Sequence, residues 1–147
     1  MFIKSEPKGK IYNELIELAF EVCDEFILVL RSDIDVSKNA NSVIESLSSS
    51  LKYSKDQFVW AGTEYLGDKP AKVFYFNTDE KAKITLLKVA NSFHDWFQPN
   101  LPEDLSFYKN GNEWLVNTAH EYSTYIYSED SEINERILKI EGISVKD

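Results

Sequence analysis

The chain has few of the residues that mark several protein classes. Its single cysteine, Cys23, excludes an intramolecular disulfide framework and any metal site built from several thiolates. Five glycines and four prolines in 147 residues are too few for a collagen-like, low-complexity or disordered chain. No apolar run approaches the roughly 20 residues that a bilayer span needs. We therefore expect a globular protein without a membrane-spanning segment.

Motifs that bind phosphate groups or present a nucleophile are missing as well. The chain contains no G-x-x-x-x-G-K-[ST], no G-x-G-x-x-G and no G-x-S-x-G pattern. Its first residues, MFIKSEPKGK, lack the apolar segment of a secretory signal. Together with the lone cysteine, this start predicts a cytoplasmic protein.

Positive charge is scarce relative to negative charge. Sixteen Lys and Arg residues stand against 25 Asp and Glu residues, which gives a net charge of −9. Such a surface repels nucleic acids and anionic membranes, so neither is expected as a partner. The excess is larger in residues 76–147, with 7 basic and 13 acidic side chains, than in residues 1–75, with 9 and 12. A basic protein partner would dock on the C-terminal part, unless the charge serves solubility alone.

The residues that are present predict one domain over 1–147, with 43% hydrophobic residues. Helical spacing of apolar residues covers 11–23, 39–51, 79–97 and 133–140, with Thr78 and either Ser128 or Ser131 as caps. Strand patterns cover 26–30, 53–65, 73–76, 105–108, 113–118 and 124–127, with turns at Gly67-Asp68 and Asn110-Gly111. This order predicts an α+β fold: a mostly antiparallel sheet of about five to six strands with helices packed on it.

The titratable residues form no recognisable catalytic or metal-binding motif. His120 and Glu121 are neighbours at a predicted strand end, so their side chains are expected on opposite faces. Cys23 lies on or beside the apolar face of the first helix and is expected to pack in the core. Most adjacent carboxylates, such as Glu103-Asp104, fall at element ends, where capping or solvation explains them. We therefore predict no metal, no cofactor and no catalytic residue.

Aromatic residues are abundant, with 9 Phe, 8 Tyr and 3 Trp. Tyr122, Tyr125 and Tyr127 cluster in the acidic part of the chain, next to Glu129 and Asp130. Aromatic rings with carboxylates around them are typical of surfaces that recognise other proteins. The alternative is ordinary sheet packing, because Tyr and Trp favour strands.

Three segments resemble a known family. They are 23–31 (CDEFILVLR), 96–105 (WFQPNLPEDL) and 107–121, which contains FYKNG and ends in HE. Over most of its length the chain looks like small acidic uncharacterised proteins of spore-forming Gram-positive bacteria, some labelled as stage III sporulation protein-like. The resemblance carries no activity onto particular positions. The sporulation label implies a membrane anchor, and the sequence has no apolar run long enough for one.

The sequence is compatible with three kinds of function. The first is a non-enzymatic protein-binding domain of the immunity or antitoxin type, with which the small size and acidity agree. It would neutralise a basic partner through an acidic, aromatic surface formed by Trp114, Tyr122, Tyr125, Tyr127, Glu129 and Asp130. The alternative is a small enzyme or small-ligand-binding protein with a pocket between sheet and helices, for which the candidates are His94, Glu64, His120, Glu121 and again Trp114. The third is a homodimer formed through a sheet edge or an aromatic patch.

Overall fold

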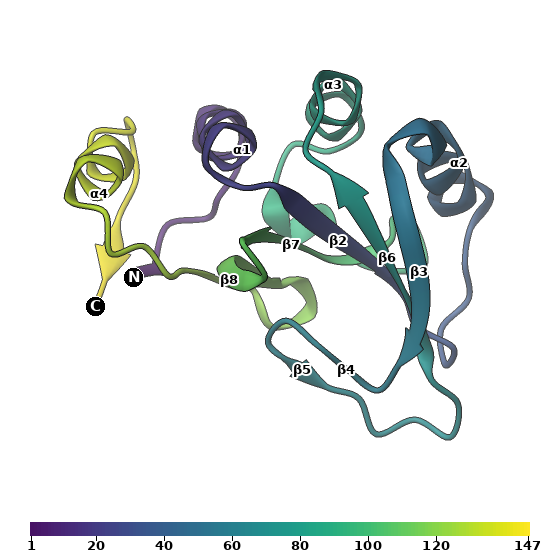
Figure 1. Cartoon of the computed structure of the whole chain (residues 1–147). Coiled ribbons are helices and arrows are strands. Elements are labelled where there is room, and N and C mark those ends of the chain that lie inside the picture. The colour runs from purple at the N-terminus through teal and green to yellow at the C-terminus, as the bar shows by residue number, and fades with distance from the viewer.

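Four α-helices cover one face of a large antiparallel sheet in the computed structural model, which describes residues 1–147 (Figure 1). The helices are α1 (Lys10–Val22), α2 (Lys38–Ser46), α3 (Glu80–Val89) and α4 (Ser131–Leu138). In spatial order the strands are β10 (Val145–Lys146), β1 (Phe2–Ile3), β9 (Ser123–Ile126), β8 (Asn112–Thr118), β7 (Glu103–Lys109), β2 (Glu25–Leu30), β6 (Ala71–Asn77) and β3 (Leu51–Gln57).

The predicted α+β class is confirmed, but the sheet has eight strands instead of five to six. The additional strands are β1 and β10, which pair with each other, Phe2 opposite Lys146 and Ile3 opposite Val145. Each has only two residues, too few to show an alternating pattern, and their pairing joins the two ends of the chain. No local sequence signal predicts such a pair.

Strand β2 has a continuous apolar run because both of its faces are covered. Phe26 and Leu28 belong to a core of 25 buried residues that lies between the sheet and the helices. Ile27 and Val29 point the other way, into a smaller core under a hairpin formed by β4 (Val59–Trp60) and β5 (Thr63–Glu64). Figure 1 shows this hairpin on the side of the sheet opposite the helices. The strand predicted at 26–30 is thus confirmed.

Helices α2 and α3 both end earlier than the sequence predicts. Helix α2 ends at Ser46 instead of 51, because a separate 3₁₀ turn, η1 (Ser48–Ser50), follows it and β3 begins at Leu51. Helix α3 ends at Val89 instead of 97 because Ser92 starts a separate 3₁₀ turn, η2 (Phe93–Asp95). The hydroxyl of Ser92 accepts a hydrogen bond from the backbone N–H of His94, and the carboxylate of Asp95 accepts one from the backbone N–H of Ser92. This reciprocal arrangement is a capping box. The N-terminal caps also differ from the prediction. Asp79 instead of Thr78 caps α3, and Asp130 instead of Ser128 or Ser131 caps α4.

The link between β3 and β6 is also longer than a tight turn at Gly67-Asp68. The paired segments end at Gln57 and Ala71, which lie opposite each other, and residues 58–70 between them contain the β4–β5 hairpin. The Asn110-Gly111 turn is confirmed: both residues have positive φ, 51° and 80°, as a type I′ turn requires. None of the helices has the length and apolarity that crossing a membrane requires.

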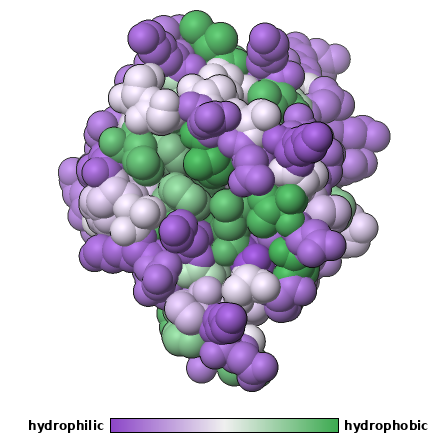
Figure 2. All heavy atoms as spheres, turned by 90° about the vertical axis from the view of Figure 1, so that its right-hand side faces the viewer, coloured by the Kyte–Doolittle hydropathy of each residue, from purple (hydrophilic) through white to green (hydrophobic).

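Strand β3 forms one edge of the sheet, and six of its seven residues are exposed. Figure 2 views the molecule from this side and shows apolar side chains gathered in the middle of the face, with hydrophilic side chains around them. Partly or fully exposed apolar residues on the elements of this side include Ile44, Leu51 and Phe74. Lys52, Lys55 and Asp56 add charge along the edge, a common protection against strand-to-strand association.

Candidate functional site

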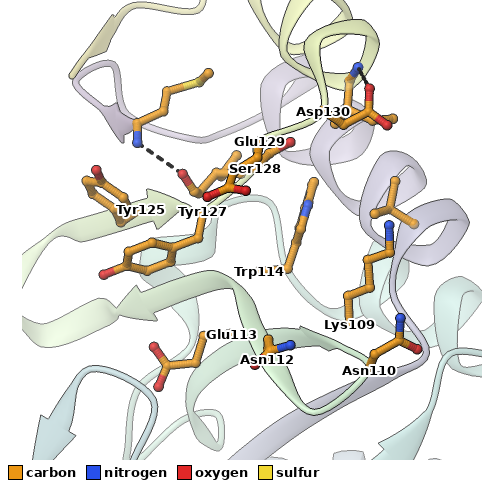
Figure 3. Close-up of a pocket in the computed structure, with 14 residues that line it drawn as sticks. Lys109, Asn110, Asn112, Glu113, Trp114, Tyr125, Tyr127, Ser128, Glu129 and Asp130 are labelled. Carbon is orange, nitrogen blue, oxygen red and sulfur yellow. Dashed lines mark hydrogen bonds between the residues drawn. The ribbon is translucent and has the colours of Figure 1, made fainter.

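A groove of about 670 Å³ lies where the β7–β8 hairpin, the end of β9 and the start of α4 meet (Figure 3). Half of its lining residues are hydrophobic and half are polar or charged. The lining residues are Met1, Val22, Lys109, Asn110, Asn112, Glu113, Trp114, Tyr125, Ile126, Tyr127, Ser128, Glu129, Asp130 and Ile133.

Trp114 forms the apolar floor of this groove, and a bulge in β8 sets its position. Phe107 pairs with Leu115 but Tyr108 pairs with Glu113, so Trp114 is an extra residue on its strand. It joins Leu115 in the core on the helix side and is almost completely buried. Its carbonyl oxygen accepts a hydrogen bond of 2.8 Å from the backbone N–H of Tyr127. Figure 3 shows Trp114 between Tyr127 on one side and Lys109 on the other.

Two tyrosines form one side of the groove. Tyr125 lies in β9 and Tyr127 directly follows the strand, so with a spacing of two residues their side chains point to the same face. Their ring centroids are 4.5 Å apart. Tyr127 is the more exposed of the two residues, with 55% of its surface accessible, whereas Tyr125 is half-buried. A pair of packed aromatic rings offers rigid contact area, since little side-chain entropy is left to lose on binding.

Negative charge exceeds positive charge around the groove. The lining holds four charged side chains, the carboxylates of Glu113, Glu129 and Asp130 and the ammonium of Lys109. It also holds the N-terminal ammonium of Met1, which donates a hydrogen bond of 3.0 Å to the carbonyl of Ile126. None of the four side chains takes part in an ion pair within the chain. One oxygen of Asp130 is engaged as the cap of α4, accepting from the N–H groups of Glu132 and Ile133. The carboxylates of Glu113 and Glu129 are exposed and are left for contact with another molecule.

Five of the six residues predicted to bind a partner line this single groove: Trp114, Tyr125, Tyr127, Glu129 and Asp130. The sixth, Tyr122, lies elsewhere. It follows a 3₁₀ turn, η3 (Ala119–Glu121), with φ of 53°, and its ring packs edge-on against His94 at 5.4 Å. The sequence does not single out Glu113 and Lys109, although Lys109 directly precedes the predicted Asn110-Gly111 turn and Glu113 lies two residues after it.

A second cleft, of about 350 Å³, opens beneath the β4–β5 hairpin. It is lined by Arg31, Asp33, Trp60, Thr63, Glu64, Tyr65, Leu66, Gly67 and His120. Glu64 and His120 are two of the residues proposed for the alternative pocket. The cleft that holds them lies on the hairpin side of the sheet and not between sheet and helices, where that pocket was expected.

The other residues of the alternative pocket are not in this cleft. Trp114 belongs to the groove, and His94 is half-buried against Tyr122. Glu121 is exposed, with its carboxylate 3.9 Å from Nε2 of His120. The expectation that His120 and Glu121 point to opposite faces of a strand is therefore wrong, because residues 119–121 form the 3₁₀ turn η3.

Beside the cleft, the structure buries two adjacent carboxylates, Glu103 and Asp104, in β7. The pair does lie at the start of β7, as the sequence predicts, but the prediction that capping or solvation explains it is wrong, because both side chains are buried. The backbone N–H of Gln98 donates to Oε1 of Glu103 at 2.8 Å. Oδ1 of Asp104 accepts from the N–H of Ala119 and Oδ2 from the indole of Trp60, both at 3.0 Å.

Burial raises the pKa of Glu103 above its ordinary value, and the hydrogen bond from Gln98 opposes this effect. Burial likewise raises the pKa of Asp104, against the hydrogen bonds from Trp60 and Ala119. Oε2 of Glu103 has no hydrogen-bond partner. Its nearest basic group is the imidazole of His120, with Nδ1 at 3.9 Å. Carboxyl groups with raised pKa beside a cleft are common at functional sites.

No protein-family model, no curated protein and no solved structure matches this chain.

Proposed function

We propose that the chain is a protein-binding domain whose groove around Trp114 receives a basic surface of a partner protein. The observation that supports this proposal is that aromatic and acidic residues, namely Trp114, Tyr125, Tyr127, Glu129 and Asp130, line one open groove. The functional class that fits best is an immunity or antitoxin-type protein, which would neutralise its partner by covering a basic active site.

The chemistry of the groove favours a partner that carries Lys or Arg. A guanidinium group can bond to an exposed carboxylate with two parallel N–H donors, and it also stacks on tyrosine rings. Glu113 and Glu129 supply free carboxylates, and Tyr127 supplies an exposed ring. Trp114 is almost completely buried, so it supports the groove from below, and its carbonyl holds the backbone of Tyr127 in place. These contacts would act together, the charges speeding association and the rings slowing dissociation.

The test compares immobilised variants for the proteins that they retain from an extract of the source cells. Tyr127→Ala removes the exposed ring, and the double variant Glu113→Gln/Glu129→Gln removes the two free charges. The matched controls are Tyr122→Ala, an exposed tyrosine outside the groove, and Glu45→Gln/Glu135→Gln, which removes two exposed acids elsewhere. Quantitative mass spectrometry of the eluates is the readout.

The expected result is at least one protein whose recovery falls about tenfold or more with both groove variants, a change equal to about 1.4 kcal/mol of binding free energy. The two controls should retain it as the wild type does, and raised salt should release it because exposed charges are screened. If every retained protein is recovered equally by groove and control variants, the proposal is wrong.

A second candidate function is small-ligand binding or catalysis in the cleft beneath the β4–β5 hairpin. The observation that favours it is the imidazole of His120 next to the buried, unpartnered oxygen of Glu103. Thermal-unfolding screens of a small-molecule panel would test it. A ligand of this cleft should raise the midpoint of the wild type but not that of His120→Asn.

Self-association remains a third prediction, with the β3 edge and the apolar face of Figure 2 as the surfaces concerned. Sedimentation equilibrium over a wide range of concentrations checks it. A homodimer predicts a mass that rises with concentration, and the monomer mass at the highest concentration would contradict it.

A further inference from the structure

Glu103, Asp104 and His120 bring three metal-ligating atoms together beside the cleft under the β4–β5 hairpin. One carboxylate oxygen from each acid and one ring nitrogen of His120 lie within 4.8 Å of one another. We propose that these three side chains bind a divalent transition-metal cation of the Zn²⁺ or Mn²⁺ class. This metal site is independent of the groove around Trp114.

The backbone of Asp104 is what places both carboxylates on one side. Consecutive residues of a regular strand point to opposite faces. Asp104 has φ of 57°, a left-handed conformation that is uncommon outside glycine, and its N–H donates to the carbonyl of Trp96 instead of continuing the regular ladder. The chain thus turns locally at Asp104, and the two acids converge on His120.

The observation that points to a ligand is the unpartnered oxygen of Glu103. The residue is only 1% exposed, and its Oε2 accepts no hydrogen bond from any group of the chain. A buried carboxylate oxygen without a partner costs free energy that a bound cation would recover. Oε2 is also the oxygen that lies toward His120, 3.9 Å from Nδ1, so the unused atom is directed into the cluster.

The surrounding groups hold the carboxylates in position without using up their capacity to bind a metal. Gln98 fixes Oε1 of Glu103 and leaves Oε2 free. Trp60 and Ala119 each donate one hydrogen bond to Asp104, and each of its oxygens keeps a further lone pair. Outer hydrogen bonds of this kind commonly orient metal-binding carboxylates.

Access and charge are also suited to a cation. His120 is exposed and lines the cleft, which gives a path from solvent and room for water or another ligand in the remaining coordination positions. Two carboxylates balance the charge of a divalent ion. The nearby positive group, Arg31, is already paired, since its guanidinium donates two hydrogen bonds to Asp33.

The donor set indicates the class of metal. Two carboxylates and one imidazole suit Zn²⁺, Mn²⁺ or Fe²⁺ better than Mg²⁺ or Ca²⁺, which prefer oxygen alone. Among first-row ions, Zn²⁺ is expected to bind more tightly than Mn²⁺.

The experiment titrates the chelator-treated, full-length chain with Zn²⁺, Mn²⁺ and Mg²⁺ by isothermal calorimetry, and follows thermal unfolding with each ion. The variants are His120→Asn, which changes an exposed ligand, and Glu103→Gln, which removes the unpartnered oxygen's charge. The controls are His94→Asn, the other histidine, and Glu135→Gln, an exposed acid of α4 away from the cleft.

One Zn²⁺ per chain is expected, with weaker Mn²⁺ binding and still weaker Mg²⁺ binding, and with a higher unfolding midpoint when Zn²⁺ is bound. His120→Asn and Glu103→Gln should each lower Zn²⁺ affinity by about tenfold or more, whereas the controls keep it. Because His120 is exposed, its variant should fold even if Glu103→Gln does not. Absence of saturable Zn²⁺ binding, or binding that His120→Asn leaves unchanged, would overturn the proposal.

Discussion

The indole N–H of Trp60 donates a hydrogen bond of 3.0 Å to Oδ2 of Asp104, 44 residues further along the chain. Both groups are buried. This bond ties the β4–β5 hairpin to β7 and closes the small core on the side of the sheet away from the helices. It also holds the carboxylate that we propose as a metal ligand, so folding of the hairpin and formation of the cleft depend on the same contact.

Replacement of Trp60 by Phe should lower the free energy of unfolding by about 1–3 kcal/mol, because Oδ2 of Asp104 would lose its buried donor. Urea unfolding followed by circular dichroism measures the change. Val59→Ala, at an exposed apolar residue of the same hairpin, serves as control and should stay within about 0.5 kcal/mol. In an Asp104→Asn background, Trp60→Phe should cost less, and full additivity of the two changes would contradict the coupling.

Two glycines with similar backbone conformations should respond differently to alanine. Gly62 and Gly111 have φ of 72° and 80°. A Cβ at Gly62 would lie 2.6 Å from Cγ1 of Val116 and 3.0 Å from Oγ1 of Thr118, whereas a Cβ at Gly111 would meet no atom within 4 Å. Gly111→Ala thus measures the backbone strain alone, about 1 kcal/mol. Gly62→Ala adds a steric clash with β8, so its total should reach roughly 2–4 kcal/mol.

Urea unfolding of both variants checks this comparison, with the m-value as a control for two-state behaviour. Equal losses of stability for the two variants would show that the hairpin does not pack as closely on β8 as the structure has it.

Elements whose signal is local could be predicted from the sequence. The apolar spacing of α1 and the Asn110-Gly111 turn each depend on neighbouring residues, and both are confirmed. The pairing of β1 with β10 depends on contacts between the two ends of the chain, and no local pattern reveals it. The early end of α3 did have a local signal, Ser92 followed by Asp95, but the apolar residues beyond it continued the helical spacing and hid it.

The two candidate sites also differ in how much of each could be predicted from neighbouring residues. Aromatic and acidic residues of the groove are close together in sequence, on β8, β9 and the start of α4, so composition alone could bring them to notice. The cluster of Glu103, Asp104 and His120 could not be found this way. It depends on the left-handed backbone of Asp104 and on the turn that carries His120, and both arise from packing between distant segments.

The lone cysteine should be chemically inert in the folded chain. Cys23 is buried at the end of α1, and burial raises the pKa of its thiol to about 12, with the nearby Asp24 adding to the rise. Because the thiolate is the reactive form, a thiol reagent at pH 8 should modify the folded chain at least about a hundredfold more slowly than the urea-unfolded chain. Absorbance of the released chromophore measures both rates. A rapid reaction without denaturant would mean that Cys23 is not buried in the folded chain.

The half-buried imidazole of His94 should make the stability of the chain depend on pH. Its Nε2 has no hydrogen-bond partner, and burial lowers the pKa of the ring below the ordinary value of 6.5. The groups that face it are Glu6 and Asp95, whose charges partly oppose this effect, and the ring of Tyr122. The unfolded chain therefore binds a proton at this residue more readily than the folded chain does.

Wherever the unfolded state binds more protons than the folded state, the free energy of unfolding rises with pH. The contribution of His94 is thus fully present above about pH 6.5 and is lost as the pH falls through the lowered value. His94→Gln cannot take up a proton, so the difference in free energy of unfolding between the wild type and this variant should shrink or reverse on acidification. Urea unfolding at a series of pH values on both sides of 6.5 gives this difference directly. A difference that is constant over the series would show that the imidazole is as accessible to water in the folded chain as in the unfolded one.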